Sequence, residues 1–534
     1  MSSNIESLAV LNVVIPLAII LIGNAVARLP VRQGWRGQQR PNRWFEALTL
    51  AGSLVCLFLS IALVINAPDE TLTFTFLGID ILLDALSVYF IFLVNIVATF
   101  AAWNAFTSPP AKRPLFFNNS VNLFHFTMLL VPMVDNLIVL WIAVEATTLV
   151  STLLVSSQDE RNSWEAAWKY LIITSTGIIF ALLGTMFLAN AAKGLLVDPN
   201  IAENRNQVMN WSFLMDNANC RAGITNCLAD DFVMLSFLFI LIGYGTKAGF
   251  APMHTWLPDG HSEAPAPISA LLSGVLLKSA LYAILRFATL TNRTLESSEF
   301  TSGLLLAVGL FSLILATPFI LNERNRFKRV LAYHSLEHMG IIAFGMGIGG
   351  EIALFGALLH TLNHAITKSL MFLAFGNVMR RFADLDVDQR QIANVLRRMP
   401  ITGGILALGG LALVGTPPFN IFLSELIILW GALSDSASTR PSWVTIGVVA
   451  LFMISTTFIF FGLIRHLARV LLQPSQYSKA ALLAHDASGT LHLQESFAEV
   501  LPLVLLTILV IVTGLAIWSP LAAVLTQSVA ILVQ

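Results

Sequence analysis

The chain has 534 residues, of which 56% are hydrophobic and 11% charged, with a mean hydropathy of +0.77 and a net charge of −1. A soluble protein of this length needs more charge to cover its water-facing surface, so the composition predicts a polytopic protein of the lipid bilayer. The near-neutral balance, without a basic tail or a glycine-rich phosphate loop, argues against nucleic acid as a partner.

The three cysteines form no CxxC motif. They are too few to hold an iron–sulfur cluster or a structural zinc ion, so we expect no cofactor in this chain. Cys56 lies in an apolar run and is interpreted as a core residue. Cys220 and Cys227 share a polar loop, where a disulfide could form if the loop faces an oxidising compartment.

Fourteen apolar runs are long enough to cross a bilayer. In chain order they cover 6–28, 45–66, 79–103, 119–134, 136–156, 168–190, 232–252, 265–290, 302–321, 330–348, 351–378, 401–432, 443–464 and 499–526. The first run lacks a basic start, so we expect a retained helix and no cleaved signal peptide. The pattern predicts an all-α polytopic membrane protein with about 14 transmembrane helices.

Lysine and arginine fall unevenly on this map. Of the 30, twenty-one lie on one side, five on the other, and four at membrane depth or near a helix end. Because cytoplasmic loops carry the excess of positive charge, both termini are expected to be periplasmic, in a bacterial inner membrane. The loop of Cys220 and Cys227 would then lie outside the cytoplasm.

Two of the predicted helices are broken. The seventh breaks just after Lys247, in a loop with four prolines, and the twelfth breaks at Pro417-Pro418. Broken helices at matching places are typical of transporters built from two inverted repeats, here of five helices each. The predicted organisation is a three-helix segment (1–118), two five-helix repeats (119–290 and 302–465), and an insert with a last helix (466–534).

Three ionisable residues of the first half lie at membrane depth, namely Glu145, Lys247 and Lys278. A charged group there is costly unless it is paired or faces a wet interior, so each is a functional hypothesis by default. Glu145 beside a lysine would form an ion pair, and changing their separation would load or unload a proton. The alternative is a static pair that holds two helices together.

In the second half, His360, His364 and Lys368 are spaced four residues apart and predict one polar stripe along a helix. Bridged by water, such a stripe can pass protons, because imidazole titrates near neutral pH. Histidines that only hydrogen-bond neighbouring helices are the alternative. Two histidines four apart can also bind a metal, but the sequence shows no third ligand, so we predict no metal site.

Several further residues are secondary candidates. His334 and His338 repeat the same spacing, but near the predicted start of their helix, which favours a peripheral role. Glu425 follows the Pro417-Pro418 break and would suit an exit for protons. The candidates to gate proton uptake surround the first break; a plain surface loop explains them equally well. They are His254, Asp259, His261 and Glu263.

Five segments together resemble the proton-conducting antiporter-like subunits of respiratory complex I, Mrp antiporters and membrane-bound hydrogenases. They are WIAVEATTLV, KAGFAPMHTWLPDGHSEAPAPISALLSGVLLKSALY, RVLAYHSLEHMG, HTLNHAITKSLMFLAFG and GTPPFNIFLSE. The resemblance covers roughly residues 120–430. The shorter strings EATTLVSTLLVSS, EAAWKYLII and SLEHMGIIAFG resemble component F of hydrogenase 4 and formate hydrogenlyase.

The resemblance implies a role for each matching residue. Glu145 would be the fifth-helix glutamate, Lys247 the broken-helix lysine and Lys278 the eighth-helix lysine. His360, His364 and Lys368 would form the eleventh-helix stripe, and Glu425 the exit residue of the twelfth helix.

We therefore predict a proton-translocating subunit of a larger complex, which contacts other membrane subunits. Electron chemistry, if present, would belong to peripheral redox partners. Two alternatives stay open: a cation/proton antiporter module, and the membrane partner of a carbonic-anhydrase-like protein that accumulates inorganic carbon. A purely structural anchor is a third reading.

Overall fold

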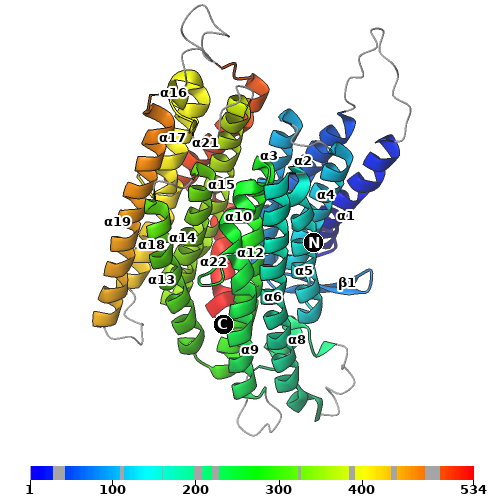
Figure 1. Cartoon of the computed structure of the whole chain (residues 1–534). Coiled ribbons are helices and arrows are strands. Elements are labelled where there is room, and N and C mark those ends of the chain that lie inside the picture. Colours follow the sequence, from blue (N-terminus) through cyan, green and yellow to red (C-terminus); the bar gives the residue numbers. More distant parts are fainter. Residues whose placement is uncertain are drawn as a thin grey trace, which may run out of the picture.

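The structure is a computed structural model that describes residues 2–27, 43–108, 113–158, 160–197, 207–218, 228–322, 326–383, 391–434, 442–474 and 493–533. Within these ranges most helices run roughly along one direction, with α1 (Ser2–Ala27) near one edge of the bundle and α19 (Ser442–Leu472) at the other (Figure 1). In the described part, ten helices are long and apolar enough to cross a membrane, with three shorter apolar helices beside them. The predicted helical, polytopic membrane protein is confirmed. Cys220 and Cys227 lie outside the described residues.

The N-terminal part contains a small hairpin that the sequence reading missed. Between α2 (Trp44–Ile65) and α3 (Ala85–Thr107), strands β1 (Leu72–Phe76) and β2 (Ile79–Leu83) pair antiparallel, with Leu72 opposite Leu83. Leu77 and Gly78 both have positive φ, 51° and 79°, as a two-residue hairpin turn requires. The expected start of the third helix at residue 79 is therefore wrong. The helix begins after Asp84, whose side chain accepts a hydrogen bond from the Ser87 backbone N–H at 2.8 Å.

The middle of the chain holds the first break. Lys247 is the last residue but one of α9, and Gly249, with φ +79°, ends that helix where the sequence predicts. A π-helical turn, η5 (Leu272–Leu276), interrupts the following span just before Lys278. The elements of this part are α4 (Pro114–Leu130), η1 (Val131–Met133), α5 (Leu137–Val155), η2 (Ser156–Gln158), α6 (Arg161–Ala191), η3 (Ala192–Val197), α8 (Trp211–Asp216), α9 (Asp230–Ala248), α10 (Trp256–Glu263), α11 (Ala266–Leu271) and α12 (Leu277–Leu295).

The last part holds the second break, between α17 (Pro400–Leu413) and α18 (Asn420–Ser434), where Gly415 has φ +67°. The fourteenth predicted run is not one helix. It forms α21 (Phe497–Leu515) and α22 (Ser519–Val533), and Pro520 lies in the first turn of α22, where proline is favoured. The remaining helices are α13 (Glu299–Leu321), α14 (Phe327–Ile348), α15 (Glu351–Ala383) and α16 (Val395–Arg398).

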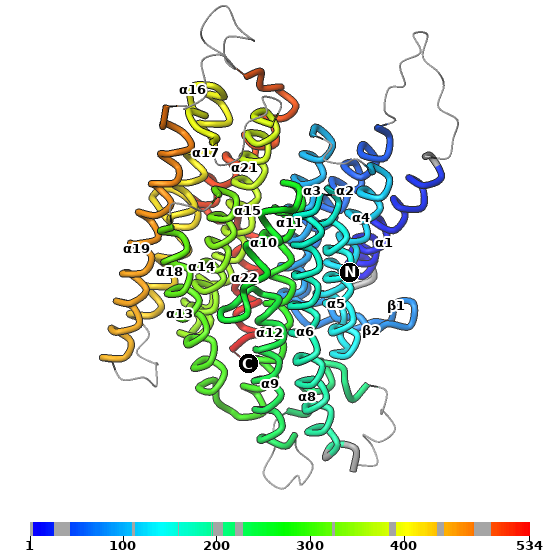
Figure 2. The backbone as a smooth tube through the Cα atoms, viewed as in Figure 1, coloured from blue at the N-terminus to red at the C-terminus, as the bar shows by residue number. Residues whose placement is uncertain are grey.

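Helix α15 lies in the interior of the bundle, as the backbone trace shows (Figure 2). It packs against α3, α11, α14, α17, α18, α21 and α22. Almost every residue of α15 between Ala353 and Val378 is buried, including its histidines and Lys368. Polar groups on this helix must therefore find partners within the protein.

Candidate functional site

Lys247 is fully buried at the end of α9 and points at α5. Its Nζ donates to the carbonyl oxygen of Val144 at 2.5 Å and to the hydroxyl of Thr148. Glu145 lies on the same helix, but its carboxylate accepts a hydrogen bond from the Ser175 hydroxyl of α6 at 2.7 Å. The described residues therefore contain no ion pair between Glu145 and Lys247. Glu145 on α5 and Lys247 on α9 would have to reorient to meet.

Lys278 is fully buried as well, directly after the π-helical turn. Its Nζ donates to the carbonyl oxygen of Ser273 at 2.5 Å and lies 2.7 Å from Nδ1 of His364 on α15. Single π turns inside α-helices are frequent at functional sites. Here the turn immediately precedes the residue that joins α12 to the histidine stripe.

A row of fully buried imidazoles continues from His364. The ring of His338 on α14 stacks on the ring of His364, with centroids 4.7 Å apart. Nδ1 of His338 lies 3.0 Å from Nε2 of His360, and Nδ1 of His360 lies 3.0 Å from the Ser424 hydroxyl on α18. His338 therefore lies between the two histidines of the stripe, and the peripheral position expected for it is wrong.

Glu425 stands at the far end of this row, next to Ser424. One of its carboxylate oxygens lies within 4.8 Å of a ring nitrogen of His338 and of a ring nitrogen of His360. Its side chain also packs against the second break, because a methyl group added at Gly415 would come within 2.5 Å of Oε2 of Glu425. The break thus leaves room for the carboxylate beside the histidines.

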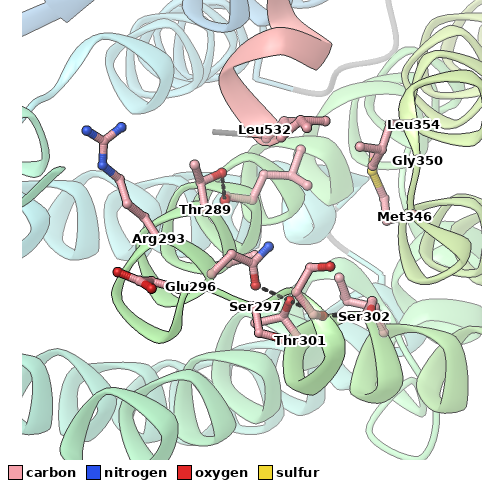
Figure 3. Close-up of a pocket in the computed structure, with 17 residues that line it drawn as sticks. Thr289, Arg293, Glu296, Ser297, Thr301, Ser302, Met346, Gly350, Leu354 and Leu532 are labelled. Carbon is pink, nitrogen blue, oxygen red and sulfur yellow. Dashed lines mark hydrogen bonds between the residues drawn. The ribbon is translucent and has the colours of Figure 1, made fainter. Parts of the chain in front are cut away.

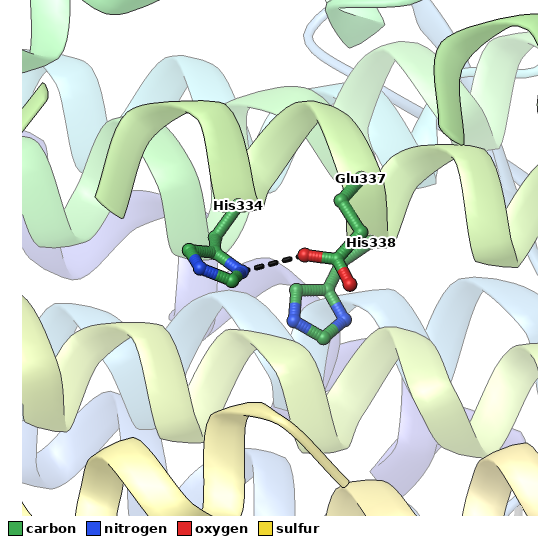
Figure 4. Close-up of side chains that lie close together, drawn as sticks. All are labelled: His334, Glu337 and His338. Carbon is green, nitrogen blue, oxygen red and sulfur yellow. Dashed lines mark hydrogen bonds and ion pairs between the residues drawn. The ribbon is translucent and has the colours of Figure 1, made fainter. Parts of the chain in front are cut away.

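Lys368 is not part of this row. Its Nζ donates to the backbone carbonyl of Leu331 on α14 and lies 5.0 Å from the ring centre of Phe372. Near it on α14, Nδ1 of His334 lies 2.5 Å from Oε2 of Glu337 (Figure 4). His334 is fully buried, so its expected peripheral place is also wrong.

The candidate gating residues differ in exposure: Glu263 lies near the surface, whereas His254 and His261 are buried. Glu263 forms an ion pair of 3.5 Å with Arg326. His254 is mostly buried, with Nδ1 3.2 Å from the carbonyl oxygen of Pro252. His261 is fully buried, and neither of its ring nitrogens has a hydrogen-bond partner in the described structure. The centre of its ring lies 5.7 Å from that of Phe372. Phe372 is on α15 and its ring is also contacted by Lys368 of the same helix.

Two buried charged residues make contacts that the sequence did not predict. Lys328, counted as a loop residue, is buried on α14 and donates to the carbonyl oxygen of Ala264. Arg286 forms two hydrogen bonds, of 2.7 and 2.8 Å, with the Asp84 carboxylate, and both side chains are 2% exposed. Arg286 lies eight residues after Lys278 within one apolar run. This spacing could have marked Arg286 as a buried charge. Its partner Asp84 could not be found in this way, because it lies about 200 residues away in the sequence.

A cavity of about 390 Å³ lies where α12, α13, α14, α15 and α22 end or begin (Figure 3). Hydroxyl and amide side chains line part of it, with Arg293 and Glu296 at one side. Met346 and Leu354, on the two helices that carry His338 and His360, lie on the other side of the cavity.

The fold and the site define a class: a polytopic membrane protein with two broken helices and a buried row of lysine, histidine and glutamate. The family described as "NADH:quinone oxidoreductase/Mrp antiporter, TM" matches residues 134–455, more than half of the chain. The chain belongs to this family.

Curated relatives agree with this assignment. The chain is 36% identical to the "Hydrogenase-4 component F homolog" of Methylacidiphilum infernorum over 411 residues, which cover 74% of this chain and 78% of that protein. It is 29% identical to "NADH-quinone oxidoreductase subunit N" of Desulforudis audaxviator, over 70% of this chain and 69% of that one. The predicted resemblance, including the one to component F, is confirmed.

Two solved structures share the fold. A chain of an archaeal membrane-bound sulfane sulfur reductase superposes with a TM-score of 0.80 at 20% identity, covering 98% of both chains. A chain of the Mrp complex from Dietzia gives 0.74 at 19% identity, covering 98% of this chain and 52% of that one.

Proposed function

We propose that this chain translocates protons across the membrane as one subunit of a larger complex. The observation that carries the proposal is the buried row from Lys278 through His364, His338 and His360 to Glu425. Its members come from four helices, with the lysine and the three histidines fully buried and Glu425 half-buried, and intramembrane ionisable chains of this kind mark proton relays.

The hydrogen-bond partners at the far end fix the tautomers of two neutral histidines. The Ser424 hydroxyl donates to the carbonyl oxygen of Ile421 at 2.9 Å, so it accepts the bond from Nδ1–H of His360. Nε2 of His360 then carries a lone pair, and Nδ1–H of His338 donates to it. The remaining nitrogen of His338, Nε2, is therefore an acceptor.

At the Lys278 end of the row, the hydrogen bonds point in the same direction, from Lys278 toward Glu425. A charged Lys278 can only donate, so Nδ1 of His364 accepts and Nε2 of His364 carries the hydrogen. Nε2 of His364 and Nε2 of His338 are both buried without a hydrogen-bond partner, and they belong to stacked rings. One is a donor and the other an acceptor, so a single bridging water would complete the row.

With that water, every bond in the row donates away from Lys278. A proton released by Lys278 would enter one nitrogen of each ring while another leaves from the opposite nitrogen. The charge would move to Ser424 without any heavy atom travelling far. The Ser424 hydroxyl would then turn from the carbonyl oxygen of Ile421 toward Glu425 to pass the proton on. The Lys368, His334 and Glu337 group would form a side branch on the same helices.

In the first half, Lys247 would carry the proton and Glu145 would tune it. The present contacts, Lys247 to Val144 and Glu145 to Ser175, describe the separated arrangement. His254, His261 and Glu263 would control uptake from the cytoplasmic side, with His261 leading toward Phe372 and Lys368.

We further infer fourteen membrane crossings, two inverted five-helix repeats and periplasmic termini in a bacterial inner membrane. The placement of one break in each half and the uneven distribution of arginine and lysine support this topology. The partners would be membrane subunits together with a peripheral redox protein, since the relatives are named as parts of hydrogenase and NADH-quinone oxidoreductase systems. No cofactor is assigned to this chain.

The proposal can be tested in vesicles that contain the whole complex, where the quenching of a pH-sensitive dye reports proton movement. Lys247→Ala and Lys278→Ala should each abolish proton movement while the complex still assembles, whereas Lys193→Ala, at an exposed outer lysine, should leave it unchanged. Full proton movement in the Lys278 variant would refute the central row.

A further inference from the structure

We propose that His338, His360 and Glu425 form a binding site for a divalent transition-metal ion of the zinc class. The sequence offers the two pairs of histidines but no third ligand. The fold supplies one by bringing Glu425 of α18 to His338 and His360, so that the three ligand atoms lie within 4.8 Å of one another. Two neutral imidazoles and one carboxylate, with a fourth position open, are a common ligand set for zinc.

The distances between the ligand atoms suit such an ion after a small adjustment. Nδ1 of His338 and Nε2 of His360 lie 3.0 Å apart, joined by one shared hydrogen. Tetrahedral bonds of about 2.0–2.1 Å to an ion would place the two nitrogens about 3.3 Å apart. For the ion to bind, the hydrogen on Nδ1 of His338 would move to Nε2 of the same ring, which has no hydrogen-bond partner. The ion in its place would then need the two nitrogens to separate by only a few tenths of an ångström. The carboxylate of Glu425 would move the most.

The surroundings orient the ligands. The Ser424 hydroxyl takes the hydrogen of Nδ1 of His360, and this leaves Nε2 of that ring unprotonated and directed at His338. An outer partner of this kind fixes the tautomer of a metal-binding histidine. Gly415 leaves space behind the Glu425 carboxylate, since a methyl group at that position would touch Oε2.

A second group of possible ligands, His334, Glu337 and His338, shares one histidine with this site (Figure 4). We favour the set with Glu425 for two reasons. His334 and Glu337 already form a short hydrogen bond, which an ion would have to break. All three residues of the second group are buried, whereas Glu425 is only half-buried and can be reached first.

The charges near the site limit its affinity, and the ligand atoms set its selectivity. When protonated, Lys278 of α12 and Lys368 of α15 repel a cation, and Glu337 of α14, when ionised, attracts one. Imidazole ligands favour zinc, cobalt and nickel over magnesium and calcium, which prefer oxygen ligands. The ligand is thus a borderline transition-metal ion that binds reversibly.

Inhibition of transport by the ion rests on the proposed function. A bound ion would occupy the nitrogens through which His338 and His360 exchange a proton, so proton movement would stop. Binding itself does not depend on that function and can be measured alone.

The test is equilibrium dialysis of the purified intact complex against zinc, with bound zinc counted by atomic emission. The wild type should bind one more zinc ion per chain than Glu425→Gln and His360→Gln, two variants that keep side-chain size. His334→Gln should bind as the wild type does. Equal zinc in the wild type and both ligand variants, or loss of zinc in His334→Gln alone, would overturn the site.

Zinc added to wild-type vesicles separates the two proposals. Loss of proton movement at the zinc concentration that fills the site supports both. If zinc binds but proton movement continues, the metal site stands and the proton route is wrong. If the chain binds no additional zinc while Lys278→Ala abolishes proton movement, the route stands and the metal site is wrong.

Discussion

Nζ of Lys278 on α12 lies 2.7 Å from Nδ1 of His364 on α15. This contact joins the helix that follows the first break to the helix that carries the histidine stripe. Lys278 donates its other bond to a carbonyl oxygen five residues earlier in its own span, so its ammonium group has a fixed direction. The ammonium group is therefore directed at one nitrogen of one ring.

Replacing Lys278 by arginine tests whether this lysine must lose its proton. A guanidinium keeps the positive charge but does not deprotonate in proteins. We expect Lys278→Arg to reduce proton movement by about a hundredfold or more, the scale on which a positioned acid or base acts. The measurement is dye quenching in vesicles with the whole complex, beside Lys278→Met. Near-normal movement in the arginine variant alone would mean that only the charge matters.

His338→Gln tests the link between the two halves of the stripe. Glutamine can hydrogen-bond to His360 but cannot take up a proton on one side and release it on the other. Proton movement should fall by about a hundredfold or more, with the complex still assembled. His125→Gln is the matched control, because His125 is also a buried histidine with one hydrogen bond, to Asn95, but lies on α4. The hypothesis fails if both variants behave alike.

Gly415→Ala should displace the carboxylate at the end of the row. A methyl group there would come within 2.5 Å of Oε2 of Glu425 at a backbone φ of +67°. Gly78→Ala carries a similar backbone strain, at φ +79°, with nothing within 4 Å. We expect the first variant to lower proton movement and the second to retain it, measured in the same vesicles. Equal loss in both would point to backbone strain alone.

The ion pair of Asp84 and Arg286 should stabilise the packing of the middle of α12 against the start of α3. Asp84→Asn keeps the hydrogen-bond acceptor at the start of α3 but leaves a buried guanidinium without its charge partner. Breaking a buried pair in this way costs about 3–5 kcal/mol of the free energy of unfolding. The midpoint of thermal unfolding of the detergent-solubilised chain should fall, while Glu70→Gln, at an exposed carboxylate, should change it little.

The same pair predicts a pH dependence. Burial alone would raise the pKa of the Asp84 carboxyl, but the Arg286 guanidinium and the hydrogen bonds from Ser87 outweigh burial and hold the pKa below its usual value. A lowered carboxylate pKa gives stability that is present above the ordinary pKa and is lost as the pH falls through the folded-state value. Unfolding midpoints measured from neutral to acidic pH should therefore fall in the wild type and change less in Asp84→Asn.

The sequence by itself determined the class of protein, the two breaks and most members of the site. Costly charges in apolar runs mark Glu145, Lys247, Lys278, His360, His364 and Lys368, because lipid tolerates them only for a reason. Helical spacing places His360, His364 and Lys368 on one face of one helix. These are local properties, so one-dimensional patterns carry them.

Only the tertiary structure decided which of these groups meet. His338 lies between His364 and His360, and Glu425 reaches both His338 and His360 from another helix. Lys368 turns away to Leu331, and Glu145 bonds Ser175 where an ion pair with Lys247 was expected. The rotation and depth of each helix result from packing against its neighbours. Residues far apart in sequence set that packing, so the spacing of residues along one helix cannot predict it.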